Sequence, residues 1–308
     1  MERTIDISIV SPVYRAEKML DKLVFEIQKA VESLNLSYEI ILVDDRSPDG
    51  SWDKMKSISK SVKEVKSVRL SRNFGQHPAI MAGLSRTKGK WVVVMDCDLQ
   101  DQPKEIIKLY NKAQEGFDVV LARRENRQDG LLKKASSKLF SIFYSFFTDT
   151  EYDNEVANFG IYNEKVIRSI LEIKDYIKFF PLFVKFVAFN QTSISVEHAE
   201  RDSGSSSYNL YKLLSLAFNS IISFSNKPLK LFVKFGILMS VIAFMVGVYY
   251  FYLYFSNKIE VEGFTSLMIS IWFLSGVLLT SVGITGIYVG KIFDQTKSRP
   301  VFIIDEVV

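Results

Sequence analysis

The sequence predicts an α/β protein that ends in two membrane-spanning helices. Two observations lead to this prediction. Short, continuously apolar runs alternate with amphipathic segments over the first third of the chain, and two long segments near the C-terminus contain no charged residue. Apolar strands that alternate with helices are typical of a parallel sheet covered on both faces. With 308 residues, 48% of them hydrophobic, the chain can also bury a sizeable core.

The first part of the chain supplies the strands and helices of this sheet in alternation. Strands are predicted at 6–14, 38–45, 67–71, 90–98 and 117–124. Amphipathic helices are predicted at 19–34, 51–62 and 77–87. Because ligands bind outside the carboxyl ends of the strands in an open α/β sheet, we expect the chemistry at the residues that end these runs.

Two later segments, 131–147 and 208–224, predict apolar helices with a few basic or polar positions. They are too short and too polar to span a bilayer, yet too apolar for an exposed surface. Two interpretations stay open. The helices lie in the membrane interface, or they pack against the sheet or another subunit.

The two charge-free segments extend from Phe235 to Phe255 and from Phe264 to Val289. At a rise of about 1.5 Å per residue, each can cross a hydrocarbon layer of roughly 30 Å, so we expect transmembrane helices rather than buried helices of a soluble domain. The second segment contains small residues that would let helices pack closely in a homo-oligomer. They are Gly276, Gly283, Gly286 and Gly290.

The charges around this helix pair predict its orientation. The loop between the helices carries Lys258 against Glu260 and Glu262, whereas both outer flanks are basic: Lys227, Lys230, Lys234, Lys291, Lys297 and Arg299. The positive-inside rule then places both flanks in the cytoplasm, as expected for a multi-pass protein of the inner (plasma) membrane. We therefore predict a cytoplasmic domain at 1–228, a two-helix transmembrane region at 229–292 and a cytoplasmic tail at 293–308. The net charge of +4 gives no indication of nucleic-acid binding.

The strongest local signal is an acidic motif after the strand at 90–98. Asp96 and Asp98 lie two residues apart in an extended segment, so their side chains project to the same side. Their oxygens could bind Mg²⁺ or Mn²⁺, which would bridge a nucleotide diphosphate, and Gln100 could add a further ligand. Cys97 should point away from the metal. The alternative is helix capping, which applies most to Asp101.

A second acidic pair, Asp44 and Asp45, ends the strand at 38–45. An acidic group at this place in a nucleotide-binding βαβ unit can hold a ribose hydroxyl or a base edge. This function needs only one of the two carboxylates, and the other could be structural. The sequence contains no Gly-rich phosphate loop, which argues against a dinucleotide enzyme or a P-loop NTPase.

Five motifs occur in the order found in the family 2 glycosyltransferases: SPVYRAE, ILVDDRSPDGS, RNFGQHPAIMAGL, MDCDLQDQP and ERDSGSSSYNLYKL. Over about residues 5–225 the chain resembles the polyprenyl-phosphate glycosyltransferases related to dolichol-phosphate mannose synthase, and its two last helices resemble those of the bacterial members. The resemblance implies a Rossmann-like nucleotide-binding glycosyltransferase fold of the A type and a metal-dependent hexosyltransferase.

The resemblance also implies the residues of the site. The substrate-binding residues would be Pro12, Tyr14, Asp44, Asp45, Arg72, Asp96, Arg124, Arg201 and Ser207. The metal would be held by Asp96, Asp98 and Gln100. The catalytic residues would be Asp98, Arg124 and Arg201, because the planar arginine fork pairs with phosphate oxygens. The chain departs from the family pattern at Glu17, which comes one position late, and at Asn158, where many members carry an acidic residue.

The implied reaction is the inverting transfer of a sugar from a nucleotide-diphosphate sugar, with a UDP-sugar favoured, to polyprenyl phosphate at the cytoplasmic membrane face, in glycan or cell-envelope assembly. The partners would be the nucleotide-sugar donor, the polyprenyl phosphate acceptor and the lipid bilayer. Two alternatives stay open. The acceptor could be a lipid-linked saccharide or another membrane molecule, or the chain could be an inactive membrane-bound partner of a glycan assembly complex. The intact set of Asp96, Asp98 and Gln100 argues against an inactive protein.

Overall fold

The computed structural model describes residues 5–124, 156–175, 179–197, 225, 227–256 and 263–308. These residues fall into two compact units. The first contains the described residues up to 197 together with 299–308, and the second contains those from 225 to 298. We describe each unit separately.

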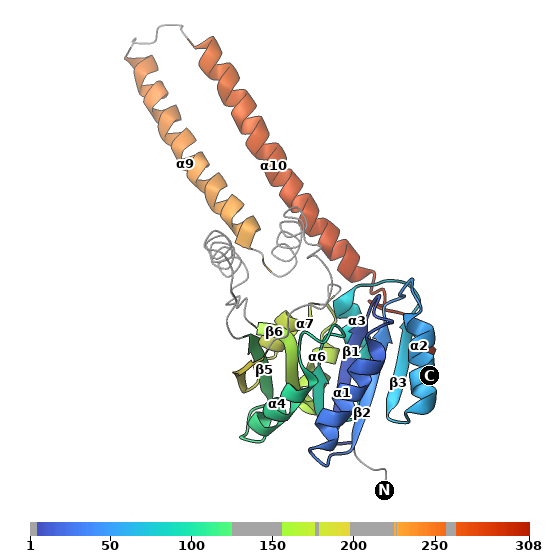
Figure 1. Ribbon diagram of the computed structural model, residues 1–308. Coiled ribbons are helices and arrows are strands. Elements are labelled where there is room, and N and C mark those ends of the chain that lie inside the picture. The colour runs from blue at the N-terminus through green and yellow to red at the C-terminus, as the bar shows by residue number, and fades with distance from the viewer. Residues whose placement is uncertain (1–4, 125–155, 176–178, 198–224, 226, 257–262) are drawn as a thin grey trace. The chain divides into compact units, whose positions relative to one another are not determined.

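Eight strands of the described residues form one mixed sheet in the order β7-β5-β6-β4-β1-β2-β3-β8 (Figure 1). The strands are β1 (Ile7–Val13), β2 (Tyr38–Asp44), β3 (Val65–Leu70), β4 (Trp91–Val94), β5 (Val119–Arg124), β6 (Val156–Asn163), β7 (Gln191–Val196) and β8 (Ile304–Val307). The four central strands, β4, β1, β2 and β3, run parallel, which confirms the predicted parallel core. On either side, β6 runs antiparallel to β4, and β8 runs antiparallel to β3.

Helices cover both faces of this sheet. They are α1 (Leu20–Glu32), α2 (Ser51–Ser61), α3 (Gln76–Leu84), the short 3₁₀ helix η1 (Pro103–Glu105), α4 (Ile106–Ala113), α6 (Glu164–Glu172) and α7 (Phe180–Phe186). Helix α1 contacts α2 and α4, whereas α3 contacts α6 and α7. Successive side chains of β1 point to opposite faces of the sheet, so the two groups of helices lie on different faces. Ile9 joins the hydrophobic core with α1, whereas Val10 points to α3.

Local sequence patterns explain these elements. Strand β1 is buried over its whole length, as expected for a strand covered on both faces. Helix α1 buries one apolar stripe at helical spacing: Leu20, Leu23, Val24, Ile27, Ala30 and Val31. Helix α3 begins at Gln76 after Gly75, whose φ of 100° is a left-handed conformation that glycine adopts readily.

Gly83 allows α3 to pack closely on the sheet. A Cβ atom at this position would lie 2.4 Å from Cγ1 of Val10 on β1 and 3.1 Å from Cγ2 of Val43 on β2. Both distances are shorter than an ordinary carbon–carbon contact of about 3.5–4.0 Å. The absence of a side chain at Gly83 therefore lets the last turn of α3 pack closely on β1 and β2.

The second unit contains two long apolar helices, α9 (Lys227–Phe255) and α10 (Phe264–Thr296). Each includes one of the predicted charge-free segments, and both are long and apolar enough to cross a membrane, with mean hydropathies of 2.1 and 1.7 over their candidate spans. The hydroxyl of Tyr288 on α10 donates a hydrogen bond of 2.7 Å to the carbonyl of Ser225, just before α9. The predicted helices at 131–147 and 208–224 lie outside the described residues.

The C-terminal residues contain a strand that the sequence analysis did not predict. Within the predicted tail at 293–308, α10 continues to Thr296 and Ile304–Val307 form β8 at the edge of the sheet. Two of the four residues of β8, Asp305 and Glu306, are charged. Charged side chains are common on edge strands, where they discourage pairing with other chains.

Replacing Gly83 by Ala is expected to destabilise the protein, although Ala normally stabilises a helix by about 1 kcal/mol relative to Gly. The added Cβ would overlap Val10, and such overpacking costs about 1–3 kcal/mol. We expect the Tm of the full-length protein in detergent to fall by several degrees. The double variant with Val10→Ala should have a higher Tm than the sum of the two single changes in Tm predicts, because the smaller side chain leaves room for the added Cβ. A Tm at or above the wild-type value in Gly83→Ala would contradict the close packing of α3.

Candidate active site

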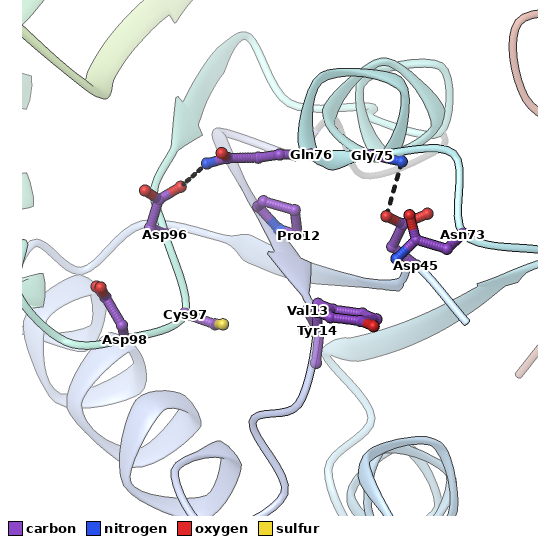
Figure 2. A pocket seen from close by; sticks show the side chains of 10 residues that line it. All are labelled: Pro12, Val13, Tyr14, Asp45, Asn73, Gly75, Gln76, Asp96, Cys97 and Asp98. Carbon is purple, nitrogen blue, oxygen red and sulfur yellow. Dashed lines mark hydrogen bonds between the residues drawn. The ribbon is translucent and has the colours of Figure 1, made fainter. Parts of the chain in front are cut away.

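A pocket of about 380 Å³ opens where the carboxyl ends of β1, β2 and β4 meet the N-terminus of α3 (Figure 2). This is the edge of a parallel sheet at which α/β proteins bind ligands. The pocket is lined by Pro12, Val13, Tyr14, Asp45, Asn73, Gly75, Gln76, Asp96, Cys97 and Asp98. Five residues predicted from the sequence therefore come together here: Pro12, Tyr14, Asp45, Asp96 and Asp98.

Asp45 connects the end of β2 to the loop before α3. One carboxylate oxygen accepts the backbone N–H of Phe74 at 2.7 Å, and the other accepts that of Gly75 at 2.8 Å. The residue is 4% exposed. Burial raises the pKa of Asp45 above its ordinary value, an effect that the two N–H donors and the charge of Arg72 oppose. The carboxylate of Asp45 thus lines the pocket and fixes the loop before α3 through two hydrogen bonds.

Asp44, the neighbour of Asp45, points elsewhere. It is fully buried, its Oδ1 accepts the N–H of Ser47 at 2.9 Å, and its Oδ2 lies 3.4 Å from Nε of Arg69 in an ion pair. The guanidinium of Arg69 also lies over the ring of Trp52, 5.4 Å from its centroid. Asp44 is not among the residues that line the pocket. Of the two candidate carboxylates, only Asp45 reaches it.

The two carboxylates of the acidic motif line the opposite side of the pocket. Oδ1 of Asp96 accepts a hydrogen bond of 2.7 Å from the side-chain amide of Gln76, and Oδ1 of Asp98 accepts the N–H of Gln100 at 3.2 Å. In Figure 2 the sulfur of Cys97 points away from both carboxylates, and the residue itself lines the pocket. Burial raises the pKa of the Cys97 thiol to about 12, so it stays neutral.

Asp96 and Asp98 offer a partial set of metal ligands. Within the described residues no group of three His, Cys, Asp or Glu side chains is arranged to hold a metal ion. Two carboxylates in one pocket do suit a hard divalent cation such as Mg²⁺, which usually takes its remaining ligands from water and substrate phosphates. Gln100 is not among the residues that line the pocket.

The chain leaves the pocket through left-handed turns at three points. A positive φ is uncommon for a residue other than glycine, and such strained conformations concentrate at functional sites. The residues and their φ angles are Arg15 at 54°, Arg46 at 56° and Leu99 at 57°. Each directly follows a residue that lines the pocket: Tyr14, Asp45 and Asp98 respectively. The strain thus marks all three strand ends that form the pocket.

The other predicted site residues lie outside the pocket or outside the described part of the chain. The guanidinium of Arg72 is exposed and lies over the ring of Phe74, 4.3 Å from its centroid. Arg124 is the last residue of β5, where it pairs with Val196 of β7. Arg201 and Ser207 fall outside the described residues.

Sequence reasoning missed three pocket residues, Asn73, Gly75 and Gln76. Asn73 and Gly75 belong to the loop that leads from β3 to α3, and Gln76, the first residue of α3, bonds directly to Asp96. The position of this loop after a parallel strand was the available signal. Glu17, by contrast, lies outside the pocket and accepts the N–H of Gly50 at 3.2 Å. It therefore caps the N-terminus of α2, where a negative charge is favourable.

His77 packs beside the pocket as a neutral residue. Its ring meets that of Phe179 edge-on with centroids 4.6 Å apart, and its Nδ1 atom is buried without a hydrogen-bond partner among the described residues. Burial lowers the pKa of His77 to about 4. These contacts indicate a packing role at the start of α3.

The chain is similar to known glycosyltransferases over nearly its full length. The family model described as glycosyl transferase family 2 matches residues 8–172. The uncharacterized glycosyltransferase YkcC of Bacillus subtilis is 34% identical over 307 residues, which cover 99% of this chain and 95% of the relative. The undecaprenyl-phosphate 4-deoxy-4-formamido-L-arabinose transferase of Salmonella choleraesuis is 32% identical over 305 residues, with coverage of 98% and 93%.

Solved structures share the fold at low sequence identity. The glucosyl-3-phosphoglycerate synthase of Mycobacterium tuberculosis, crystallised with Mn²⁺, UDP-glucose and phosphoglyceric acid, matches with a TM-score of 0.52 and 14% identity over 71% of this chain and 78% of its own. The mannosyl-3-phosphoglycerate synthase of Rubrobacter xylanophilus matches with a TM-score of 0.50 and 18% identity, over 71% and 72%. Both comparisons support the predicted A-type glycosyltransferase fold.

The partly buried, neutral His77 predicts a pH dependence of stability. The unfolded chain takes up a proton at this residue below about pH 6.5, whereas the folded protein does so only below about pH 4. Stability should therefore fall as the pH drops through this window, by at most about 1.4 kcal/mol per pH unit from this residue. The Tm of the wild type should decline more steeply between pH 7 and pH 5 than that of His77→Gln. Parallel pH profiles would show that His77 is not buried in its neutral form.

Proposed function

This chain belongs to glycosyl transferase family 2, and we propose that it transfers a sugar from a nucleotide-diphosphate sugar to a polyprenyl phosphate. The observation that carries the proposal is the pocket at the ends of β1, β2 and β4, which presents Asp45 on one side and Asp96 with Asp98 on the other. The carboxylate that we assign to the nucleoside and the pair that we assign to the metal thus line one pocket, which supports binding of a single nucleotide-sugar.

We assign the nucleoside of the donor to the β1 and β2 side of the pocket. Asp45 would accept a hydrogen bond from the base or the ribose, and Pro12 with the 44% exposed Tyr14 would provide an apolar and aromatic surface. We favour a UDP-sugar, as the sequence resemblance suggested. The complex of the M. tuberculosis synthase with UDP-glucose shows that a protein of this fold accepts such a donor.

Asp96 and Asp98 would hold a Mg²⁺ or Mn²⁺ ion, which supplies charge stabilisation for the departing nucleoside diphosphate. A phosphate oxygen of the lipid attacks the anomeric carbon from the side opposite the diphosphate. The new carbon–oxygen bond forms while the bond to the diphosphate breaks, and the electron pair leaves with the nucleoside diphosphate, so the anomeric configuration inverts. Because the lipid phosphate is already anionic near neutral pH, no strong general base is needed.

The arginines Arg124 and Arg201 are proposed to bind phosphate groups of the donor or the acceptor, as the family resemblance implies. Arginine suits this role because it remains charged and can bind two phosphate oxygens at once. The reaction then depends mainly on positioning and on charge stabilisation, both of which lower the barrier without acid–base chemistry.

The second unit would bring the enzyme to its acceptor. A long prenyl chain stays in the bilayer, and α9 and α10 are long and apolar enough to anchor the protein there. We propose a multi-pass protein of the plasma membrane with its catalytic domain in the cytoplasm, in agreement with the basic flanks of the helix pair. The name of the Salmonella relative, an undecaprenyl-phosphate transferase, supports a lipid phosphate as the acceptor.

The reaction can be tested by mass spectrometry of lipid products. Purified full-length enzyme would be incubated with polyprenyl phosphate, Mg²⁺ or Mn²⁺ and a panel of UDP- and GDP-sugars. We expect a polyprenyl-phosphate sugar whose rate of formation drops about 100-fold or more in Asp98→Ala, because an electrostatic contact to the leaving diphosphate is lost. Asp53→Ala, which removes an exposed carboxylate of α2 that pairs with Lys56, serves as the matched control and should leave the rate unchanged. Donor binding without a lipid product in the wild type would point to another acceptor.

The two neighbouring carboxylates should respond differently to loss of charge. Asp45→Asn is expected to raise the donor KM about tenfold or more and to lower the Tm as well, because the amide can accept only one of the two backbone N–H groups and leaves the other without a partner. Asp44→Asn should instead lower stability by about 2 kcal/mol, because it leaves the mostly buried Arg69 without its counter-charge, and should change the donor KM little. Steady-state kinetics and thermal melts separate the two effects, and a reversed pattern would assign the nucleoside contact to Asp44.

A further inference from the structure

The last residues of the chain form a regular hydrogen-bonded ladder with β3. The N–H of Ser67 donates to the carbonyl of Val308 at 2.9 Å, and the N–H of Val308 donates to the carbonyl of Ser67 at 2.8 Å. Beyond the register shift between Arg69 and Leu70, the N–H of Ser71 donates to the carbonyl of Ile303 at 2.9 Å. These bonds fix β8 along β3, the second strand from the pocket strand β1.

One side chain of β8 extends to the turn that follows β2. Oδ2 of Asp305 accepts a hydrogen bond of 2.7 Å from Nη1 of Arg46, and the two side chains are 48% and 41% exposed. Arg46 is the residue directly after Asp45, and its φ of 56° is left-handed. For a non-glycine residue, such a conformation persists only where surrounding contacts hold it. The ion pair with Asp305 is a contact of this kind.

The turn after β2 is also bonded to the turn after β1. The N–H of Asp45 donates to the carbonyl of Val13 at 3.0 Å, and the N–H of Arg15 donates to Oγ of Ser47 at 3.2 Å. The backbone around Arg46 is therefore part of the wall that carries Asp45 and Tyr14. A change in the conformation of Arg46 would move the carboxylate of Asp45 relative to the pocket.

We propose that β8 is a positioning element of the donor site, in which Asp305 holds Arg46 in the left-handed conformation that places Asp45 in the pocket. The inference rests on the proposed function, because Asp45 is there assigned to the nucleoside. Neither Asp305 nor Arg46 lines the pocket, so both are positioning residues rather than catalytic ones. The C-terminal residues of the chain thereby contribute to donor affinity from outside the site.

A simpler role for β8 is to cover the edge of β3, as native proteins commonly do with exposed strand edges. This role depends on the main-chain ladder and not on the charge of Asp305. The two roles therefore differ in what they predict for a substitution that keeps the shape of the side chain. Removal of the charge should weaken nucleotide binding if β8 positions the turn, and should have no such effect if β8 only covers the edge.

The test measures the Kd of UDP, and in parallel of GDP, for the full-length protein in detergent with Mn²⁺ present, by titration calorimetry. Asp305→Asn is expected to raise the Kd about threefold to fivefold, the size expected when a half-exposed ion pair is lost. The Tm and the kcat at saturating donor should stay at their wild-type values. A charge-reversed chain with Arg46→Asp and Asp305→Arg should return the Kd to within twofold of the wild type.

Glu306→Gln provides the matched control. Glu306 lies next to Asp305 on the same strand and makes no ion pair with any residue that the structure describes. Its substitution should leave the Kd unchanged. Equal Kd values for wild type, Asp305→Asn and Glu306→Gln, or a failure of the charge-reversed chain to recover affinity, would overturn the positioning role while the proposed donor site stands. A wild-type protein that binds neither nucleotide would overturn both proposals.

Discussion

The carboxylate of Asp45 is the contact on which the geometry of the pocket depends. A buried carboxylate without hydrogen bonds is costly, so its two oxygens must find donors, and they bind the N–H groups of Phe74 and Gly75 across 29 and 30 residues of sequence. This fixes the loop before α3 against the end of β2. Directly after this loop, the first residue of α3, Gln76, bonds to Asp96 at the end of β4. The ends of β2 and β4 are thereby joined through the start of α3.

The sheet gives these contacts their common edge. Because β4, β1, β2 and β3 run parallel, their carboxyl ends meet on one side, where the turns that follow β1 and β2 are hydrogen-bonded to one another. At the other end of α3, Gly83 in its last turn leaves room for Val10 and Val43, so that the helix packs closely on β1 and β2. The close packing on the sheet and the polar contacts in the pocket therefore involve opposite ends of the same helix.

The sequence predicted strands β1 to β5 and helices α1 to α3 of the first unit, because continuously apolar strands and amphipathic helices leave distinct periodic patterns. It made no prediction for α4, β6, α6, α7 or β7. It could not separate Asp44 from Asp45, because adjacent strand residues face opposite sides and the side that becomes the pocket depends on α3. It also missed β8. This strand is short and contains two carboxylates. It pairs with β3, where Ser67 bonds to Val308, and sequence patterns carry no information about a pairing over such a long separation in the chain. The role of Glu17 as a cap for α2 likewise depends on a contact across 33 residues.

The charges of the pocket bear on the need for a metal ion. Its lining includes three carboxylates, those of Asp45, Asp96 and Asp98, and no lysine or arginine among the described residues. A nucleoside diphosphate would meet like charges there, which oppose its binding in a partly buried site. A divalent cation held by Asp96 and Asp98 would reverse the sign of the charge on that side and leave Asp45 free to select the nucleoside. We infer that metal dependence follows from the electrostatics of this pocket itself, and that Arg124 and Arg201, the phosphate-binding residues implied by the family resemblance, would supply the remaining positive charge.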